Sequence, residues 1–306
     1  MAPAPLPEAG TMPQPNLQDA QAVVDLFQEA AAANLNARCR QGSIDVIDPP
    51  GRLIASGDLH DNPIHFAKLA QAANLGEGAS GDAQRAHLTL HEIIHSDRLM
   101  NGMDFSFRAL GRAAALKLDH PEHVHTLLAN HELAQVIGSG LVKDGVSVVE
   151  AFEEGVEYAF GDQTEQVIRA IGVFIRSMPL ALRCKGPEGD VLCSHSLPGP
   201  FVMDRFDPDV LERELTDDDY VPRQGSAHLM IWGRNHKPEQ LESLAQQWGV
   251  KLFVLGHEKA ENGVLFVPPN ALVLNSDHER GVYLPLDLAD PPSAEEAAGM
   301  VVPLSQ

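Results

Sequence analysis

The stretch Leu53-Ile54-Ala55-Ser56-Gly57-Asp58-Leu59-His60 decides the fold that we expect for this chain. Its first half is mostly apolar, and it passes through a glycine into a loop that carries two polar groups. This order is typical of a buried strand that ends in a functional loop. Asp58 and His60 are separated by one residue, so both side chains project to the same side of an extended backbone. Together they are able to chelate one cation.

Strands and helices alternate on both sides of this stretch, which predicts an α/β fold. Pro63–Asn74 has apolar residues at helical spacing, so a strand, a loop and a helix follow one another. The same unit recurs further along the chain. The other predicted segments are a helix at Leu17–Leu35, a strand at Ile44–Ser56 broken by Asp48-Pro49-Pro50-Gly51, a strand at His87–Leu90 followed by His91-Glu92, a helix at Phe105–Leu118, and a strand at Val124–Leu128 followed by Asn130-His131-Glu132.

The second half of the chain is expected to be more antiparallel. Val146–Met178 has a helical pattern, and its acidic residues, from Glu150 to Glu157, are interpreted as a solvated helix face. Three later strands have no long predicted helix between them. These strands are Val191–Ser194, which ends at His195, then His228–Trp232, and Leu252–Leu255, which ends at Gly256-His257.

We expect a single domain over residues 17–290, with the region 146–178 as a helical acidic insertion. Met1–Asn16 is rich in Pro and Ala and lacks the basic start and apolar centre of a secretory signal, so it is interpreted as a flexible leader. Pro291–Gln306 has few large residues and is expected to form a weakly ordered tail. The sequence leaves the oligomeric state open.

Composition limits the partners and the location. The 306 residues include 22 Lys and Arg against 43 Asp and Glu, a net charge of −21, which disfavours broad binding to nucleic acid or to an anionic membrane. No apolar stretch approaches the roughly 20 residues of a membrane helix. Cys39, Cys184 and Cys193 are odd in number and lack zinc-finger spacing. They predict a reducing compartment, with the cytoplasm as the default location.

Polar groups follow the predicted strand ends along the sequence. Besides Asp58 and His60, the residues Asn130, His195 and His257 each come at or just after such an end. Because ligands bind at the carboxyl ends of parallel strands, we expect these groups to converge. Carboxylate, amide and imidazole ligands without a thiolate fit Mn, Fe or Zn better than calcium or a structural zinc.

Taken in order, these motifs resemble those of the calcineurin-like metallophosphoesterases, in particular the branch with the Ser/Thr protein phosphatases and the diadenosine tetraphosphatases. The resemblance covers roughly residues 53–286. It implies a four-layer αββα sandwich in which two mixed β-sheets pack face to face with helices outside. The motifs are Gly57-Asp58-Leu59-His60, the segment Pro121–Glu132 that ends in Asn130-His131-Glu132, Cys193-Ser194-His195-Ser196-Leu197, and Leu255-Gly256-His257-Glu258 followed by Glu261-Asn262-Gly263.

The resemblance also implies two transition-metal ions, with Mn, Fe or Zn as the expected metals. It places Asp58, His60 and His257 on the first ion. It places Asn130 and His195 on the second ion, which Asp58 also touches beside a bridging acid.

Three further roles follow from the same resemblance. His131 is the implied acid that protonates the leaving oxygen. Asp97 is the implied acidic partner that orients this imidazole, and Arg98 is the implied phosphate-binding arginine.

The second motif departs from the family pattern. Glu92 stands where the family has its bridging aspartate, and Asp97-Arg98 arrives two residues late. Glutamate can still bridge two cations, but its extra methylene is expected to alter the metal spacing or preference. His91 and His95 flank Glu92 and are secondary ligand candidates.

Two phosphate-binding arginines of the protein phosphatases are replaced by Leu128 and Leu255. Their loss removes charge-assisted hydrogen bonds, which weighs against tight phosphoprotein binding in the usual manner. Arg234 is the residue expected to compensate as a substrate-binding group. His278 is a further candidate for the pocket.

The implied activity is hydrolysis of a phosphomonoester or a phosphoanhydride by a metal-bound hydroxide, without a covalent phosphoenzyme. The substrate is expected to be a phosphoprotein or a small molecule. Two alternatives stay open. One is a nucleotide hydrolase of the diadenosine tetraphosphatase kind, and the other is a phosphate-binding pseudoenzyme in which Glu92 has impaired the metal pair.

Overall fold

The central strands bury side chains on both of their faces, and this sets the layers of the fold. The computed structural model describes residues 16–76, 85–138, 142–143 and 145–305. In β10 (Val250–Leu255), Leu252 and Val254 belong to one hydrophobic cluster, and Phe253 and Leu255 belong to another. Because successive side chains of a strand point to opposite faces, the two clusters lie on opposite sides of the sheet. The cluster that contains Leu252 and Val254 joins the two sheets. The cluster that contains Phe253 and Leu255 joins sheets and helices.

Both sheets are mixed, as predicted. In the larger sheet β9, β10 and β12 run parallel, with antiparallel neighbours at either side. In the smaller sheet β3, β4 and β5 run parallel, and β13 is antiparallel to β3. The larger sheet has the order β1 (Arg40–Gln41), β2 (Ile44–Ile47), β8 (Ala181–Cys184), β9 (Asp190–Ser194), β10, β12 (Ala271–Leu274), β11 (Val264–Val267), and the smaller has the order β14 (Val302–Pro303), β13 (Val282–Asp287), β3 (Arg52–Ser56), β4 (His87–Leu90), β5 (Val124–Thr126).

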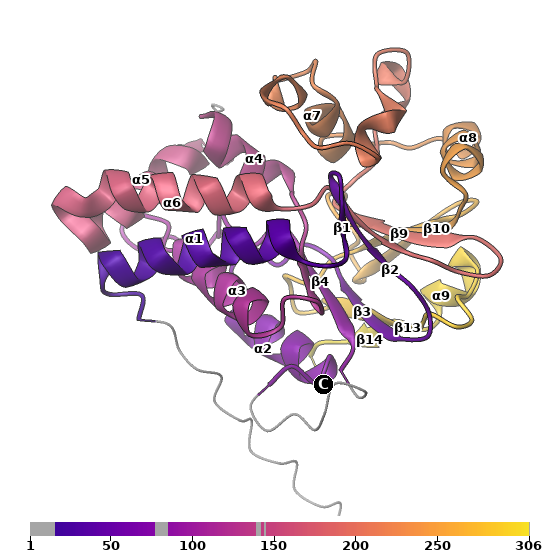
Figure 1. Cartoon of the computed structure of the whole chain (residues 1–306), viewed down its shortest axis with the longest axis horizontal. Coiled ribbons are helices and arrows are strands. Elements are labelled where there is room, and N and C mark those ends of the chain that lie inside the picture. Colours follow the sequence, from indigo (N-terminus) through magenta and orange to yellow (C-terminus); the bar gives the residue numbers. More distant parts are fainter. Residues whose placement is uncertain (1–15, 77–84, 139–141, 144, 306) are drawn as a thin grey trace, which may run out of the picture.

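Helices cover the sheets from outside. Figure 1 shows α1, α3, α5 and α6 gathered on one side of the sheets, while α7 and α8 lie on another. A small hairpin of β6 (Val142–Lys143) and β7 (Val146–Ser147) precedes α5. The helices are α1 (Ala20–Asn36), α2 (Pro63–Ala72), α3 (Phe107–Asp119), α4 (Asn130–Ile137), α5 (Val148–Phe160), α6 (Thr164–Ser177), α7 (Ser226–Ile231), α8 (Pro238–Trp248) and α9 (Ala294–Ala298), with short 3₁₀ segments at Gly161–Gln163, Pro200–Val202, Pro208–Leu211 and Asp217–Tyr220.

Local signals explain where several helices begin. The Asp19 side chain accepts hydrogen bonds from the backbone of Gln21 and Ala22 at the start of α1. Asn62 accepts one from the backbone of His65 at the start of α2, whose first residue is Pro63. Such caps satisfy backbone N–H groups that have no partner inside the helix. None of the helices in the described part of the chain combines the length and apolarity needed to cross a membrane.

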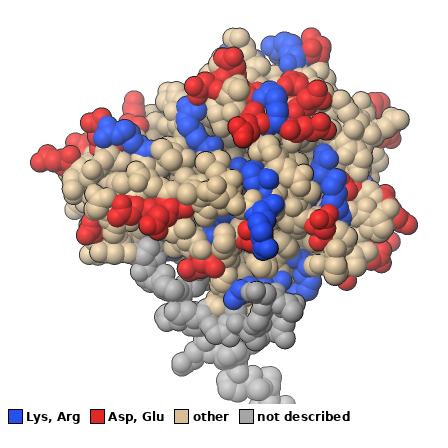
Figure 2. Space-filling model, viewed as in Figure 1, with Lys and Arg blue, Asp and Glu red and all other residues tan. Residues whose placement is uncertain are grey.

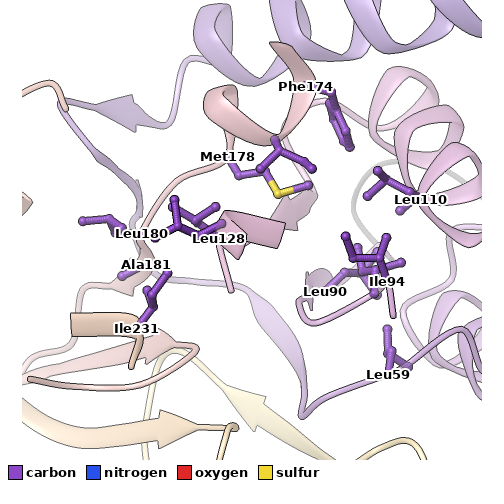
Figure 3. Close-up of a cluster of buried hydrophobic side chains, with 14 of the residues drawn as sticks. Leu59, Leu90, Ile94, Leu110, Leu128, Phe174, Met178, Leu180, Ala181 and Ile231 are labelled. Carbon is purple, nitrogen blue, oxygen red and sulfur yellow. The ribbon is translucent and has the colours of Figure 1, made fainter. Parts of the chain in front are cut away.

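Apolar residues within the site motifs anchor those motifs in the core. Leu59 lies between Asp58 and His60 in sequence and is buried, as are Leu90 and Ile94 on either side of Glu92. Figure 3 shows Leu59, Leu90 and Ile94 grouped together, with Leu110 beside them. The hydrophobic core therefore fixes the backbone from which the polar groups of the site project.

The prediction of a strand at His228–Trp232 is wrong, because Ser226–Ile231 forms helix α7. All six residues of α7 are buried. A short apolar run that is buried on every side has no amphipathic period, so periodicity alone does not separate helix from strand.

The prediction of a weakly ordered tail is also wrong. Ser293 and Glu296 form a capping box at the start of α9, and β14 pairs with β13. Ala294, Ala297 and Leu304 are buried, so two small residues and one leucine are enough to pack this segment against the core. Residues 1–15 of the predicted leader lie outside the described residues.

The acidic region 146–178 is helical, as predicted, and its glutamates from Glu150 to Glu157 are exposed. It consists of two helices, α5 and α6, and α6 packs along α1. The rings of Phe27 in α1 and Phe174 in α6 lie 5.6 Å apart between centroids and are fully buried. The region therefore contributes to the main core.

We expect the substitution Phe174→Ala to lower the free energy of unfolding by about 3–5 kcal/mol, because it leaves a cavity between α1 and α6. Urea denaturation followed by circular dichroism measures this change. Val173→Ala is the matched control, since Val173 is 51% exposed, and it is expected to change stability by less than about 0.5 kcal/mol. Equal losses in the two variants would contradict the packing described here.

Candidate metal centre

The candidate site lies where strands of both sheets end. Asp58 follows β3, and Glu92 follows β4. His195 and His257 follow β9 and β10 of the other sheet, and Asn130 is the first residue of α4, just after β5. Isolated bridges from Asp58 to His91 and to Asn275 extend the pairing at this edge. The structure thus brings together groups that are up to 199 residues apart in sequence.

Four donor atoms converge at one position of the site. Nε2 of His195 lies 2.6 Å from Oδ1 of Asn130, 2.8 Å from Oε2 of Glu92 and 3.0 Å from Nδ1 of His257. Nδ1 of His257 is also 3.0 Å from Oδ1 of Asn130. A carboxylate, an amide oxygen and two imidazoles at this spacing can surround a single cation.

The carboxylate of Glu92 reaches two groups of donors. While Oε2 faces His195, Oε1 lies 3.0 Å from Nε2 of His60 and 3.6 Å from Nε2 of His131. Glu92 is buried and has a backbone φ of +47°, a left-handed value that few residues other than glycine adopt. This backbone turn and the longer side chain place one oxygen on each side, which fits the predicted bridging role.

Glu132 holds the loop that carries Glu92. Its Oε1 accepts hydrogen bonds from the backbone of Ile93 at 2.7 Å and of Ile94 at 3.2 Å, and the residue is fully buried. The sequence placed Glu132 in the third motif without giving it a role. Its position after Asn130-His131, on the first turn of α4, is the sequence feature that indicates this role, because that turn faces the loop that carries Glu92.

Asp58 links the ends of β3 and β10. Both of its carboxylate oxygens accept the backbone N–H of His257, at 3.0 and 2.9 Å. A Cβ atom on Gly256 would lie 2.2 Å from Oδ1 of Asp58, and one on Gly57 would lie 2.0 Å from the carbonyl oxygen of Leu274. The two motif glycines are therefore required by close approach.

The charges of the centre are arranged as carboxylates facing imidazoles. Burial disfavours the charged form of His195, but Glu92 and Asp58 outweigh this and raise the pKa of His195 to about 10. Burial opposes ionisation of Glu92, yet the imidazole of His131 and its neighbours hold the pKa of that carboxyl well below its usual range. Burial and His195 together lower the pKa of His257 to about 3. The buried carboxylates thus attract positive charge to this position, where they hold the proton of His195, and a metal cation there would take the place of that proton.

The donor set fits transition metals. Among the described residues, three groups of possible ligands occur here: Asp58 with His91 and His195, His60 with Glu92 and His131, and Glu92 with His195 and His257. The third group shares His195 with the first and Glu92 with the second. Oxygen and imidazole donors without a thiolate match Mn, Fe or Zn.

Comparison with solved structures identifies the fold. The protein serine/threonine phosphatase from Saccharomyces cerevisiae with similarity to human phosphatase PP5 matches with a TM-score of 0.62 at 15% identity, over 88% of this chain and 83% of that chain. The cold-active protein-tyrosine phosphatase of a psychrophilic Shewanella matches with a TM-score of 0.54 at 16% identity, over 83% of this chain and 80% of that chain. The chain has the calcineurin-like metallophosphoesterase fold. No protein-family model and no curated protein sequence matches it.

Within this metallophosphoesterase fold, His257 belongs with a different set of donors from the one expected. The resemblance placed it on the first metal with Asp58 and His60. Its Nδ1 instead faces His195 and Asn130, while only its backbone N–H contacts Asp58. The direction of a side chain at the end of β10 depends on the turn after Gly256, where His257 has a φ of +68°. Spacing in the sequence does not give that turn.

The two predicted arginines lie at the site, on different loops. Nη2 of Arg98 donates to the backbone oxygens of His60, at 2.9 Å, and Asp61. Nη1 of Arg234 donates to the backbone oxygen of His257 at 2.8 Å. Both side chains are exposed, so both guanidinium groups remain accessible to a ligand.

The residue next to the His131 ring is His95. The two rings lie 5.1 Å apart between centroids, and Nε2 of His95 is 3.1 Å from Oε1 of Gln135. His95 is buried, whereas Asp97 is exposed on the following loop. The orienting role of Asp97 remains a prediction.

His91 is closer to the centre than the sequence indicated. Its Nε2 lies 3.0 Å from the backbone oxygen of Ser56, and its Nδ1 lies 3.2 Å from Nδ1 of His195. A carbonyl oxygen only accepts, so Nε2 of a neutral His91 ring donates and its Nδ1 carries the lone pair. Nδ1 of His195 can then donate to Nδ1 of His91 or to Oδ1 of Asp58, which lies 3.5 Å from it, and Nε2 of His195 is the nitrogen left to face Asn130, Glu92 and a cation. His91 thereby supplies the partner that metal-binding histidines usually find in a carboxylate or carbonyl.

We expect His91→Leu to weaken metal binding by about 10- to 100-fold, because His195 loses one of the two acceptors, His91 and Asp58, that orient its ring and set its tautomer. The side-chain amide of His91→Gln can both accept from His195 and donate to Ser56, so this variant is expected to stay close to the wild type. Titration of the metal-stripped proteins with Mn or Zn against a chromophoric chelator measures the affinity. Equal affinity in the two variants would contradict the hydrogen-bonded chain from Ser56 to His195.

Proposed function

We propose that the protein is a metal-dependent phosphoesterase that hydrolyses phosphomonoesters with a hydroxide activated by two metal ions. The observation that carries this proposal is the Glu92 carboxylate, which has one oxygen toward His195 and the other toward His60 and His131. Two ions about 3.5–4 Å apart would polarise the phosphoryl oxygens and lower the pKa of a bound water. The metallophosphoesterase fold, shared with two kinds of protein phosphatase, supports the same reaction class.

We assign the residues of the site to three roles, which are metal binding, proton donation and phosphate binding. Asp58 and His60 would hold the first ion with Glu92, and Asn130, His195 and His257 would hold the second. Each ion then has both oxygen and imidazole donors.

His131 is the proposed proton donor to the leaving oxygen. Its Nε2 lies 3.6 Å from Glu92, and its ring lies 5.2 Å from that of His60 between centroids. The side chain is 11% exposed, so it is accessible from the surface while staying beside the proposed metals. Removing a positioned acid of this kind typically costs about 10²- to 10⁴-fold in rate.

Phosphate binding is proposed for Arg98 and Arg234. Leu128 and Leu255, which replace two arginines of the protein phosphatases, are buried in the core. The two remaining guanidinium groups are fastened to the backbone beside His60 and His257. They can therefore donate to the oxygens of a phosphate from two sides.

The first test is hydrolysis of p-nitrophenyl phosphate and bis-p-nitrophenyl phosphate by metal-stripped protein, with Mn, Fe, Zn, Ni and Mg added back separately. We expect a transition metal to restore turnover, with the monoester preferred. His131→Asn is expected to lower kcat by about 10²- to 10⁴-fold while metal content stays the same. His123→Asn is the control, since His123 stacks on His87 away from the centre.

The result that would contradict this proposal is specific. If the wild type binds two ions per chain and still shows no turnover above His131→Asn, the proposed reaction is contradicted. If it binds no ion or a single one and shows no turnover, the phosphate-binding pseudoenzyme, in which Glu92 has impaired the metal pair, is the better description.

A further inference from the structure

A cavity of about 440 Å³ lies beside the candidate metal centre. It is formed by the segment from Gly199 to Arg205, by Arg223, and by the region of α7 from His228 to Asn235. Its arginine and aromatic side chains are Phe201, Arg205, Arg223, His228, Trp232 and Arg234. Its volume is in the range typical of small-molecule pockets.

The cavity is physically joined to the metal centre. Arg234 lines it and donates through Nη1 to the backbone oxygen of His257, with Nη2 3.4 Å from the ring nitrogen Nδ1. The ring of Trp232 lies edge-on to that of His257, with centroids 6.2 Å apart. The hydroxyl of Ser196, next to His195, donates to the backbone oxygen of Gly233 at 2.7 Å. A molecule in the cavity is therefore adjacent to a phosphate at the centre.

The cavity is basic in a strongly acidic protein. Three arginines line it, and no aspartate or glutamate is among its lining residues, although the chain carries a net charge of −21. Figure 2 shows acidic side chains over much of the rim of the face that it displays. A second cavity, which contains Arg98, also contains Asp277 and Glu279. The charge pattern favours a ligand with an anionic group in addition to the reacting phosphate.

The same cavity presents aromatic surface. Phe201 is 89% exposed, which is unusual for so large an apolar side chain. Trp232 stacks on His228 with an interplanar angle of 15° and centroids 5.5 Å apart. Nδ1 of His228 accepts the backbone N–H of Arg223, which holds this pair against the arginine loop. Exposed aromatic rings near arginines are the surfaces on which nucleobases stack.

We propose that this cavity binds a nucleotide that carries two phosphate groups, with the base at Phe201 and the second phosphate between Arg205 and Arg223. Arg234 then contacts the phosphate that faces the metal centre. Hydrolysis of this nucleotide rests on the proposed function. Binding of the nucleotide in the cavity does not depend on that function. An exposed aromatic ring beside three arginines suits a nucleobase and its phosphates better than an extended phosphopeptide, which is the alternative that the test decides.

The kinetic test compares adenosine 3′,5′-bisphosphate and ADP with AMP, p-nitrophenyl phosphate and a phosphotyrosine peptide. We expect KM for the two doubly phosphorylated nucleotides to be at least about tenfold below that for AMP, since an ionic hydrogen bond to a second phosphate is added. Arg205→Gln and Phe201→Ser are each expected to raise KM for these nucleotides about tenfold while leaving p-nitrophenyl phosphate unaffected. Arg169→Gln, on the exposed surface of α6, is the matched control.

A binding measurement separates this proposal from the proposed function. Calorimetric titration of ADP into metal-stripped protein is expected to show binding that Arg205→Gln and Phe201→Ser weaken and Arg169→Gln does not. Turnover of p-nitrophenyl phosphate without nucleotide binding or preference would overturn the cavity proposal and leave the phosphoesterase intact. Nucleotide binding without any metal-dependent turnover would overturn the proposed phosphoesterase and leave the cavity proposal intact. Preference for the phosphotyrosine peptide, lost in the same variants, would also overturn the nucleotide assignment.

Discussion

The site depends first on the hydrogen bonds from the backbone N–H of His257 to the carboxylate of Asp58. Asp58 follows β3 of the smaller sheet and His257 follows β10 of the larger one, so this contact ties the two sheets together at the edge where the donors meet. Gly256 permits the approach, because a Cβ atom there would overlap the carboxylate. With this contact in place, the ends of β4, β5 and β9 add Glu92, Asn130 and His195 around one point. An aspartate that fixes the backbone in this way is already oriented to receive a cation.

Burying so many ionisable groups together is costly unless each has a partner. The centre meets this requirement by alternating carboxylates with imidazoles, and Glu92 is the group shared by both sides. His91, which contacts the backbone oxygen of Ser56, and Oδ1 of Asp58 are the two acceptors near Nδ1 of His195, and they leave its Nε2 to face inward. Outside the centre, Arg98 and Arg234 are fastened to backbone oxygens on opposite loops. The protein therefore holds its donors in place through its own contacts, and a metal ion would add charge to a site that is already organised.

The sequence predicted the parts of this structure that depend on strand ends. The run from Leu53 to His60 and the convergence of Asp58, Asn130, His195 and His257 follow from apolar segments that run into polar groups, and the two mixed sheets follow from the family resemblance that these motifs carry. It did not predict features that depend on the direction of a side chain. The grouping of His257 and the role of His91 depend on turns with unusual φ angles and on contacts across the sheets. Helix α7 and the ordered C-terminal segment were missed because buried small or uniformly apolar residues carry no periodic signal.

The central claim is that Glu92 bridges two metal ions, and electron paramagnetic resonance of the Mn-loaded protein tests it most directly. Two Mn ions that share a carboxylate are magnetically coupled, so the account predicts the spectrum of a coupled pair. In Glu92→Gln the account predicts that this coupled spectrum disappears. A wild-type spectrum that consists only of isolated Mn ions, with an intensity that accounts for all the bound metal, would contradict the account.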